Sequence, residues 1–399
     1  MKNLTVEEAR ARMLAGVAPG APERVALDTA AIGRVLAAPI AATRDQPPFV
    51  ASAMDGWAVR RQDALDAEAV LRIVGESAAG AGFPGVLGPG EAVRIFTGAP
   101  VPEGADLVCI QEEAERDGET VRLGPLAEAK TNLRPRGGDF RAGQVLLEAG
   151  TRLNAARLSL AAAAGAAQAL VAPRPRVAIL ATGEELAPAG SAPGPWQIFD
   201  SNSPGLSALA AGWGAQVQRL ASTGDDLEAI VRAVREVEAD LIVTIGGASV
   251  GDHDLVKPAM ERLGLRQAVG TVAVRPGKPT WFGTLGDGRR VLGLPGNPAS
   301  AFVCAELFLR PLLAAWQGAD PDLPMIAARL AEPLAATGPR EHWMRAVLSV
   351  DDEGALIARC FPDQDSSLVG VFARADALVR RRAGAPAAAA GERVEVLRL

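Results

Sequence analysis

The stretch LIVTIGGASVGDHD, residues 241–254, decides the fold class of the second half of the chain. It opens with a continuous apolar run, which is typical of a strand buried on both faces of a parallel sheet, and it ends in a glycine-rich loop. Similar apolar runs recur at 177–181 (VAILA), 272–274 (VAV) and 291–294 (VLGL). Helical patterns separate these runs, at 204–211, 225–238, 254–263 and 298–316. This alternation predicts a doubly wound α/β domain with a parallel sheet over 173–318.

The flanking regions have a different texture. Residues 45–140 hold short β-type runs between glycines and prolines, which predicts a small β-rich domain; the runs are 70–74, 92–96 and 107–110. Helices are expected over 5–15, where Thr5 and Glu8 form a capping box, over about 28–38, and over 154–170 behind Asn154 as cap. After Pro321 and Pro324 the pattern is β again, and it predicts a C-terminal β domain over 319–399.

Composition excludes several classes of function. The 399 residues carry 41 Lys plus Arg against 47 Asp plus Glu, and a net charge of -6 argues against a dedicated nucleic-acid binder. Three widely spaced cysteines imply no disulfide framework, and with only two histidines they offer no zinc site. A metal would therefore rest on carboxylates, which favours Mg²⁺.

The chain shows no pattern of a membrane or secreted protein. Its first residues, MKNLTVEEARARML, lack the apolar core of a secretory signal. The longest apolar stretch, LSLAAAAGAAQALVA at 158–172, is shorter than the roughly 20 residues of a membrane span and is interpreted as a packed helix. We expect a cytoplasmic protein.

Loops that follow the apolar runs carry the candidate functional residues. In an open parallel sheet, ligands bind beyond the carboxyl ends of the strands, so we expect these four loops on one crest. The candidates are Thr182, Gly183, Glu184 and Glu185 after the first run, Gly246, Gly247, Ser249 and Asp254 after the second, Arg275 and Lys278 after the third, and Pro295, Gly296, Asn297 and Ser300 after the fourth. Asp225 and Asp226 stand at a nearby helix start.

The chemistry of these loops indicates a phosphorylated ligand. Small residues and helix N-termini bring backbone N–H groups close to an anion, and Arg275 and Lys278 add cationic donors. Carboxylates beside such a cradle suit a Mg²⁺-bridged phosphate ester. A nucleotide-like ligand is therefore predicted.

Structural interpretations of the same residues stay open. Asn297-Pro298 is also an ordinary helix start, Asp225 and Asp226 can simply cap a helix, and Lys278 and Glu185 can be solvated surface charges. Asp55-Gly56 is a turn signal that needs no catalytic explanation. The spacing Gly80-x-Gly82-x-x-Gly85 matches a dinucleotide fingerprint but is rejected, because it contains Pro84 and precedes further β pattern.

Eight motifs together resemble one family. They occur in the order SAMDGWA (52–58), FTGAPVPEGADLVCIQEE (96–113), RPRGGDFRAGQVLLEAGTRL (134–153), TGEEL (182–186), DSN (200–202), IGGASVGDHD (245–254), RPGKP (275–279) and GLPGNPAS (293–300). Over residues 52–300 the chain resembles the molybdopterin molybdenumtransferases, a family that includes the E domain of gephyrin.

The resemblance implies a reaction and an architecture. Members insert molybdate into adenylylated molybdopterin with Mg²⁺-dependent hydrolysis of the pyrophosphate link, releasing AMP. They are elongated homodimers whose helical first domain is discontinuous, here 1–44 and 141–172, around a β insert at 45–140. The active site lies between the α/β domain of one subunit and the β insert of the other. Molybdopterin adenylyltransferase and molybdoenzyme apoproteins are implied as protein partners.

The resemblance also assigns roles to particular residues. It implies Asp55, Thr97, Glu185, Asp254 and Lys278 as catalytic, with Glu185 and Asp254 as metal ligands. Gly296 and Asn297 match the pterin-binding helix start, and Asp225 or Asp226 matches a family aspartate. Arg345 and Ser366 correspond to molybdate-binding residues of the C-terminal domain. Arg275 departs from the lysine of many members, which keeps the charge but changes the hydrogen-bond geometry.

Three alternatives remain beside this assignment. A molybdopterin adenylyltransferase shares the α/β domain but lacks the flanking β domains, so residues 45–140 argue against it. A gephyrin-like scaffold that anchors other proteins is the non-enzymatic alternative. Tungstate could replace molybdate, because nothing in the sequence separates two oxyanions of nearly equal size.

Overall fold

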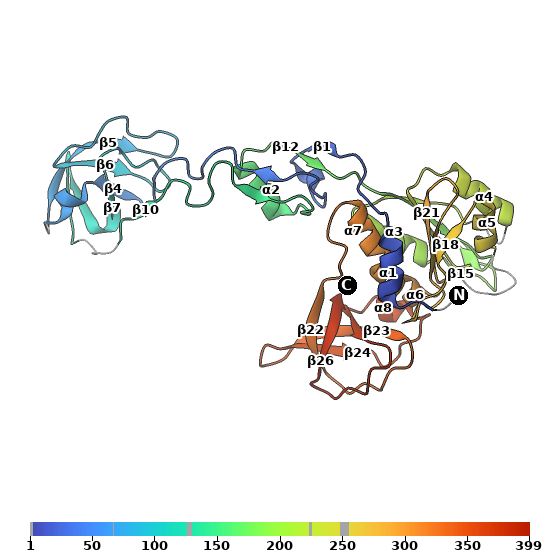
Figure 1. Ribbon diagram of the computed structural model, residues 1–399. Coiled ribbons are helices and arrows are strands. Elements are labelled where there is room, and N and C mark those ends of the chain that lie inside the picture. Colours follow the sequence, from blue (N-terminus) through green and yellow to red (C-terminus); the bar gives the residue numbers. More distant parts are fainter. Residues whose placement is uncertain (1–2, 67, 126–129, 223–225, 248–254) are drawn as a thin grey trace.

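The computed structural model describes residues 3–66, 68–125, 130–222, 226–247 and 255–399. The molecule is elongated, with a β-rich region at one end and the α/β region at the other, beside the C-terminal sheet (Figure 1). A narrow middle region joins the two ends and contains α2 (Ala155–Ala163) and the antiparallel pair β1 (Glu23–Ala26) and β12 (Gln168–Val171).

The α/β region is built on a mixed sheet. Its strand order is β16 (Gln216–Arg219), β13 (Arg176–Ala181), β17 (Leu241–Ile245), β21 (Arg290–Leu294), β20 (Trp281–Thr284) and β18 (Arg266–Val269). The first four strands run parallel, and the last two are antiparallel to their neighbours. Successive side chains of a strand point to opposite faces, so Ile179 and Leu180 enter different core clusters. The continuous apolar runs are explained by this burial on both faces.

Helices cover both faces of this sheet, as a doubly wound fold requires. On one face pack α1 (Val6–Leu14), α3 (Asn202–Gly212), α6 (Pro298–Cys304) and α7 (Arg310–Trp316). On the other face pack α4 (Leu227–Glu236) and α5 (Val256–Arg262). The predicted capping box is present at the start of α1, where the Glu8 N–H donates to the Thr5 hydroxyl at 3.1 Å and the Thr5 N–H donates to Glu8 at 2.8 Å.

One helical stretch is long and apolar enough to cross a membrane. It runs over Pro298–Trp316, the one such stretch among the described residues, and it includes a π-helical segment at Ala305–Leu309. Of its most apolar part, 72 % is buried inside the fold. It packs as a core helix against the sheet.

The prediction that 272–274 is a strand of the parallel sheet is wrong. β19 (Val274–Arg275) instead pairs parallel with β23 (Glu341–Val350) of the C-terminal sheet, Arg275 standing opposite His342. The position beside β21 is taken by β20, antiparallel to it. A run of three apolar residues is too short to determine which strand it pairs with. The loop after it therefore begins at the C-terminal sheet and not at the parallel sheet.

The C-terminal strands form a closed sheet, because its last strand pairs back with its second strand. The sheet order is β19, β23, β24 (Leu356–Cys360), β22 (Met325–Leu330), β26 (Arg393–Arg398) and β25 (Ala377–Arg381), and β25 also pairs with β23. A short helix, α8 (Val369–Phe372), follows β24. The closed arrangement encloses a small apolar core that includes Ala346, Val379 and Val396.

The other end of the molecule is β-rich, as predicted. Its sheet order is β7 (Leu107–Ile110), β4 (Gly56–Val59), β6 (Glu91–Ile95), β5 (Val70–Ser77), β9 (Thr120–Leu123) and β8 (Ala114–Asp117). A short pair, β3 (Ala51–Ser52) with β10 (Leu133–Arg134), stands where the chain enters and leaves. Strand β6 follows the glycine spacing at 80–85, so no dinucleotide-binding helix forms there.

Two helix predictions fail in the middle region. The helix expected over 28–38 is only a 3-10 turn at Thr29–Ala31, because Gly33 has a positive φ of 78° and the chain turns away. Helix α2 ends at Ala163 instead of 170, since Gly165, at φ 90°, reverses the chain and 168–171 then pairs with β1. A second antiparallel pair, β2 (Ile40–Ala41) with β11 (Val145–Leu147), completes this region.

Candidate active site

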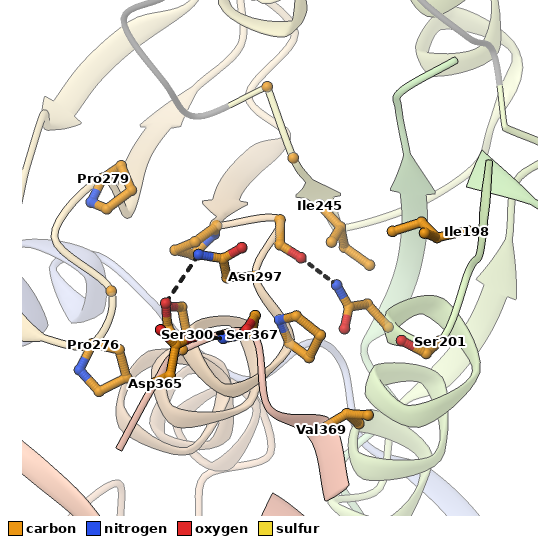
Figure 2. A pocket seen from close by; sticks show the side chains of 18 of the residues that line it. Ile198, Ser201, Ile245, Pro276, Pro279, Asn297, Ser300, Asp365, Ser367 and Val369 are labelled. Carbon is orange, nitrogen blue, oxygen red and sulfur yellow. Dashed lines mark hydrogen bonds between the residues drawn. The ribbon is translucent and has the colours of Figure 1, made fainter. Parts of the chain in front are cut away.

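A cavity of ≈ 930 Å³ opens at the carboxyl ends of the parallel strands. Figure 2 shows its wall, where the loop after β21 and the start of α6 meet residues 364–369 of the C-terminal region. Eleven predicted residues line it: Thr182, Glu185, Gly246, Gly247, Arg275, Lys278, Pro295, Gly296, Asn297, Ser300 and Ser366. The structure thus brings together the loops that the sequence placed on one crest.

Three of these loops touch through their backbones. The Thr182 N–H donates to the Ile245 carbonyl at 3.2 Å, and the Gly246 N–H donates to the Leu294 carbonyl at 3.1 Å. A Cβ on Gly246 would lie 3.0 Å from the Thr182 carbonyl oxygen, and its φ is 84°. Glycine is therefore required where the loops converge.

Gly183 gives room to the neighbouring carboxylate. Its φ of 140° is unfavourable for other residues, and a Cβ there would lie 2.3 Å from Glu185 Oε2. Gly183 itself does not line the cavity, but the Glu185 side chain folded against it does. The glycine acts on the cavity through Glu185.

Two of the cavity's cations come from the segment that joins the two sheets, and a third, Arg340, precedes β23. Arg275 and Lys278 are both exposed and both line the cavity. Arg275 ends β19 and therefore lies on the C-terminal sheet, whereas Lys278 lies in the turn that leads back to β20. Positive charge thus reaches the cavity from the boundary of the two regions.

Asn297 is not used as a helix cap. It occupies the cap position before Pro298, but its side chain makes no capping bond. Its Nδ2 instead donates to Ser366 Oγ at 2.9 Å, the contact drawn in Figure 2. Ser300, one turn into α6, is buried and also lines the cavity. The cavity wall is therefore shared by the α/β and C-terminal regions.

Residues 200–202 line the cavity, although the sequence assigned them no role. Asn202 Nδ2 donates to the Gly296 carbonyl at 2.6 Å, which ties α3 to the loop after β21. The strand β15 (Ile198–Phe199) pairs parallel with β14 (Leu186–Ala187), and the three residues that follow β15 in the chain line the cavity: Asp200, Ser201 and Asn202. Their signal was the DSN motif, which contributed to the resemblance but received no role.

Arg345 lies behind the cavity wall. Its side chain is fully buried, and its Nη2 donates to the Asp365 carbonyl at 2.8 Å. Its Nε and Nη1 are buried without a hydrogen-bond partner in the described part of the chain. Ser366 lines the cavity itself. Of the two residues predicted to bind molybdate, Ser366 thus belongs to the segment 364–366, and Arg345 is hydrogen-bonded to that segment.

Asp55 and Thr97 form a pair far from this cavity. They lie beside β4 and β6, at the opposite end of the molecule in Figure 1. Asp55 Oδ1 accepts from the Thr97 N–H and the Thr97 hydroxyl, both at 2.7 Å. These two bonds hold the pKa of Asp55 below its ordinary value, so the carboxylate stays ionised. Within one chain, this pair does not line the cavity.

The remaining predicted residues divide between a structural role and the undescribed segments. Asp226 caps α4, its Oδ1 accepting from the N–H groups of Glu228 at 2.9 Å and Ala229 at 3.1 Å, and it does not line the cavity. That favours the capping interpretation for Asp226. Asp225, Ser249 and Asp254 lie outside the described residues.

No group of three His, Cys, Asp or Glu side chains that could hold a metal ion occurs among the described residues. The described carboxylates on the cavity wall are Glu185, Asp200 and Asp365. Oxygen donors of this kind are what Mg²⁺ prefers. Among the described residues, these carboxylates are therefore individual candidate ligands for a cation, and they do not form a group of three that could hold it together.

Comparison with known proteins decides the family. Residues 4–165 match the MoeA N-terminal region (domain I and II), 178–315 match a probable molybdopterin binding domain, and 327–399 match the MoeA C-terminal region (domain IV). The molybdopterin molybdenumtransferase of Haemophilus influenzae is 32 % identical over 400 residues, 98 % of each chain. The chain belongs to the molybdopterin molybdenumtransferase family.

Further relatives agree with this assignment. Molybdopterin molybdenumtransferase 1 of Mycobacterium tuberculosis is 33 % identical over 419 residues, again 98 % of each chain. A solved structure of a MoeA protein of molybdopterin biosynthesis from Pyrococcus horikosii has a TM-score of 0.79 at 30 % identity, over 100 % of this chain and 99 % of that one. As a member of this family, the chain is a transferase of molybdenum cofactor biosynthesis.

Proposed function

We propose that this enzyme inserts molybdate into adenylylated molybdopterin, with Mg²⁺-dependent hydrolysis of the pyrophosphate link and release of AMP. The observation that carries the proposal is the composition of the cavity wall. Close-packed glycine backbone, the exposed cations Arg275 and Lys278, and the carboxylate of Glu185 face one space of ≈ 930 Å³. An anionic, phosphorylated ligand is what such a wall suits.

The pterin substrate is held at the crest of the sheet in this proposal. Backbone N–H groups of small residues approach a phosphate oxygen closely, which fits Gly247 and Gly296, whereas the Gly246 N–H already donates to the Leu294 carbonyl. Thr182, Pro295 and Ser300 shape the same wall. Lys278 shares the charge that develops on the phosphate oxygens as the bond between phosphorus and the bridging oxygen breaks. The attacking oxygen comes from water or from molybdate.

The proposed metal ligands are Glu185 and Asp254. Glu185 lines the cavity, and its carboxylate oxygens are hard donors of the kind that Mg²⁺ binds. When bound, the cation would neutralise charge on the pyrophosphate oxygens. Asp254→Ala is expected to abolish turnover without unfolding the chain, and normal turnover would remove Asp254 from the site.

Molybdate is proposed to bind beside residues 364–366. Arg345, whose buried Nε and Nη1 have no partner among the described groups, lies behind the cavity wall and places positive charge next to it, which suits a dianionic oxyanion. Ser366 adds a hydroxyl at the cavity surface. Arg275 carries positive charge to the same wall.

A homodimer completes the site in this proposal. Asp55 and Thr97 lie at the far end of the chain from the cavity and do not line it, so they act only on a second copy. Supply of the substrate by a molybdopterin adenylyltransferase, and delivery of the product to molybdoenzyme apoproteins in the cytoplasm, belong to the same proposal.

The test is AMP release from adenylylated molybdopterin with Mg²⁺, measured with and without molybdate. Molybdate-dependent release is the expected result, and tungstate in a parallel reaction determines which oxyanion is accepted. AMP release at the same rate with and without molybdate or tungstate would contradict insertion of the oxyanion. Pterin binding without release would favour the adenylyltransferase or scaffold alternatives instead.

A further inference from the structure

The turn Gly277–Thr280 presents Lys278 to the cavity. The Thr280 N–H donates to the Gly277 carbonyl at 3.0 Å, and this bond closes a four-residue turn in which Lys278 is the first of the two central residues. Lys278 is exposed, whereas Thr280 is fully buried. The position of the lysine therefore depends on what lies under the turn.

Thr280 and Cys304 form a buried contact beneath this turn. The Thr280 hydroxyl donates to the Gly277 carbonyl at 2.8 Å, and Cys304 Sγ lies 3.1 Å from the same hydroxyl oxygen. Cys304 Sγ is also 3.8 Å from the Gly277 carbonyl oxygen. A Cβ on Gly277 would lie 2.1 Å from this sulfur, and the φ of Gly277 is 116°. No other residue type fits between Cys304 and the turn.

Cys304 also connects the turn to α6, whose first residues belong to the cavity wall. It is the last residue of α6, and Ser300, four residues earlier, lies on the same side of that helix. Ser300 and the preceding Asn297 line the cavity. One short helix thus contacts the cavity at its start and the lysine-bearing turn at its end.

We propose that Thr280 and Cys304 are positioning residues that fix Lys278 relative to the start of α6. The lysine and the backbone at 296–300 then meet the same anionic group of the substrate. Errors of about 1 Å in such a placement cost roughly 100-fold in rate. The proposal rests on the proposed function for the identity of that group, but not for the contact itself.

The first test observes Lys278 without any substrate. The chain has four lysines, Lys2, Lys130, Lys257 and Lys278, so reductive methylation with ¹³C gives few NMR signals. A Lys278→Arg sample assigns the Lys278 signal. We expect Thr280→Val, which keeps the shape but removes the hydroxyl, to shift or broaden this signal. Thr280→Ser, which keeps the hydroxyl, is the matched control and should leave it in place, and Lys130 should not respond.

An unchanged Lys278 signal in Thr280→Val overturns the proposal, and so does an equal change in both variants. If Thr280→Val does not fold, Cys304→Ala replaces it, because it opens space beneath Gly277 and is expected to move the same signal. An unchanged Lys278 signal in Cys304→Ala would also overturn the proposal.

The second test measures AMP release with molybdate and Mg²⁺. Thr280→Val should lower kcat about tenfold or more in protein that is still folded at the assay temperature, whereas Thr280→Ser should stay near the parent rate. A parent rate in Thr280→Val contradicts the positioning role. Absence of release in the parent enzyme overturns the proposed function alone, and the NMR result then decides the positioning role.

Discussion

Asn297 at the start of α6 and Ser366 of the C-terminal region are joined by a hydrogen bond, in which Asn297 Nδ2 donates to Ser366 Oγ at 2.9 Å. Both residues line the cavity. Ser366→Ala removes the hydroxyl that is proposed to bind molybdate. Because one hydrogen bond contributes about 1 kcal/mol, we expect this change to raise the KM for molybdate roughly five- to tenfold. Steady-state AMP release at varied molybdate measures this.

Ser367→Ala is the matched control for that change. Ser367 lines the same cavity, but its hydroxyl donates to Asp365 Oδ1 at 2.7 Å. Its KM for molybdate should stay near the parent value. Equal effects of the two substitutions would show that the segment, and not the Ser366 hydroxyl, matters.

Asp55 provides a test of the two-subunit site. Asp55→Asn and Lys278→Ala should each lose turnover, because the first alters the carboxylate that Thr97 holds and the second removes a cation of the cavity. Unfolded and refolded together in equal amounts, the two variants should recover about a quarter of the parent activity, since half of the dimers then hold one intact site of two. Sedimentation confirms the dimer, and recovery that stays at zero rejects a site shared between copies.

Burial of His342 predicts a pH dependence of stability. Burial first, and then the charges of Arg275, Arg345 and Arg340, lower the pKa of His342 to about 4 from the ordinary value of 6.5. Between pH 4 and 6.5, His342 is therefore protonated in the unfolded chain and neutral in the folded chain. The free energy of unfolding consequently falls as the pH drops from 6.5 to 4. The loss approaches about 3 kcal/mol below pH 4.

Substitution of His342 isolates this contribution from the carboxylates that titrate in the same range. In His342→Gln, thermal unfolding should depend less steeply on pH between 4 and 6.5 than in the parent, while the two curves run parallel above pH 7. Curves of the same slope throughout would mean that His342 is protonated in the folded enzyme.

The capping interpretation of Asp226 can be separated from a binding role. Asp226→Ala should lower the free energy of unfolding by about 1 kcal/mol, as loss of a helix cap does, and should leave the KM for the pterin substrate unchanged. Asp226→Asn keeps the capping oxygen and should match the parent in both measurements. A raised KM in Asp226→Asn would instead place this carboxylate at the ligand.

Several features of the fold follow directly from local sequence. The run 241–245 is buried because every residue in it is apolar or small, and α1 starts at Val6 because Thr5 and Glu8 satisfy each other's backbone N–H groups. The loops after β13, β17 and β21 meet because parallel strands end at one edge of their sheet. These are short-range effects, and a sequence pattern captures them.

Tertiary structure decided what local pattern could not. The run 272–274 has the composition of a core strand, yet β19 pairs with β23, because the neighbour of a strand depends on chain segments about 70 residues away. For the same reason Asn297 binds Ser366 and not its own helix, and Asp55, beside β4, lies at the opposite end of the molecule from the cavity of its own chain. The sequence alone determined the apolar runs, the caps and the glycine-rich loops, whose causes lie within a few residues. Which loops form a common wall was determined only by packing, since contacts between distant segments carry no local signal.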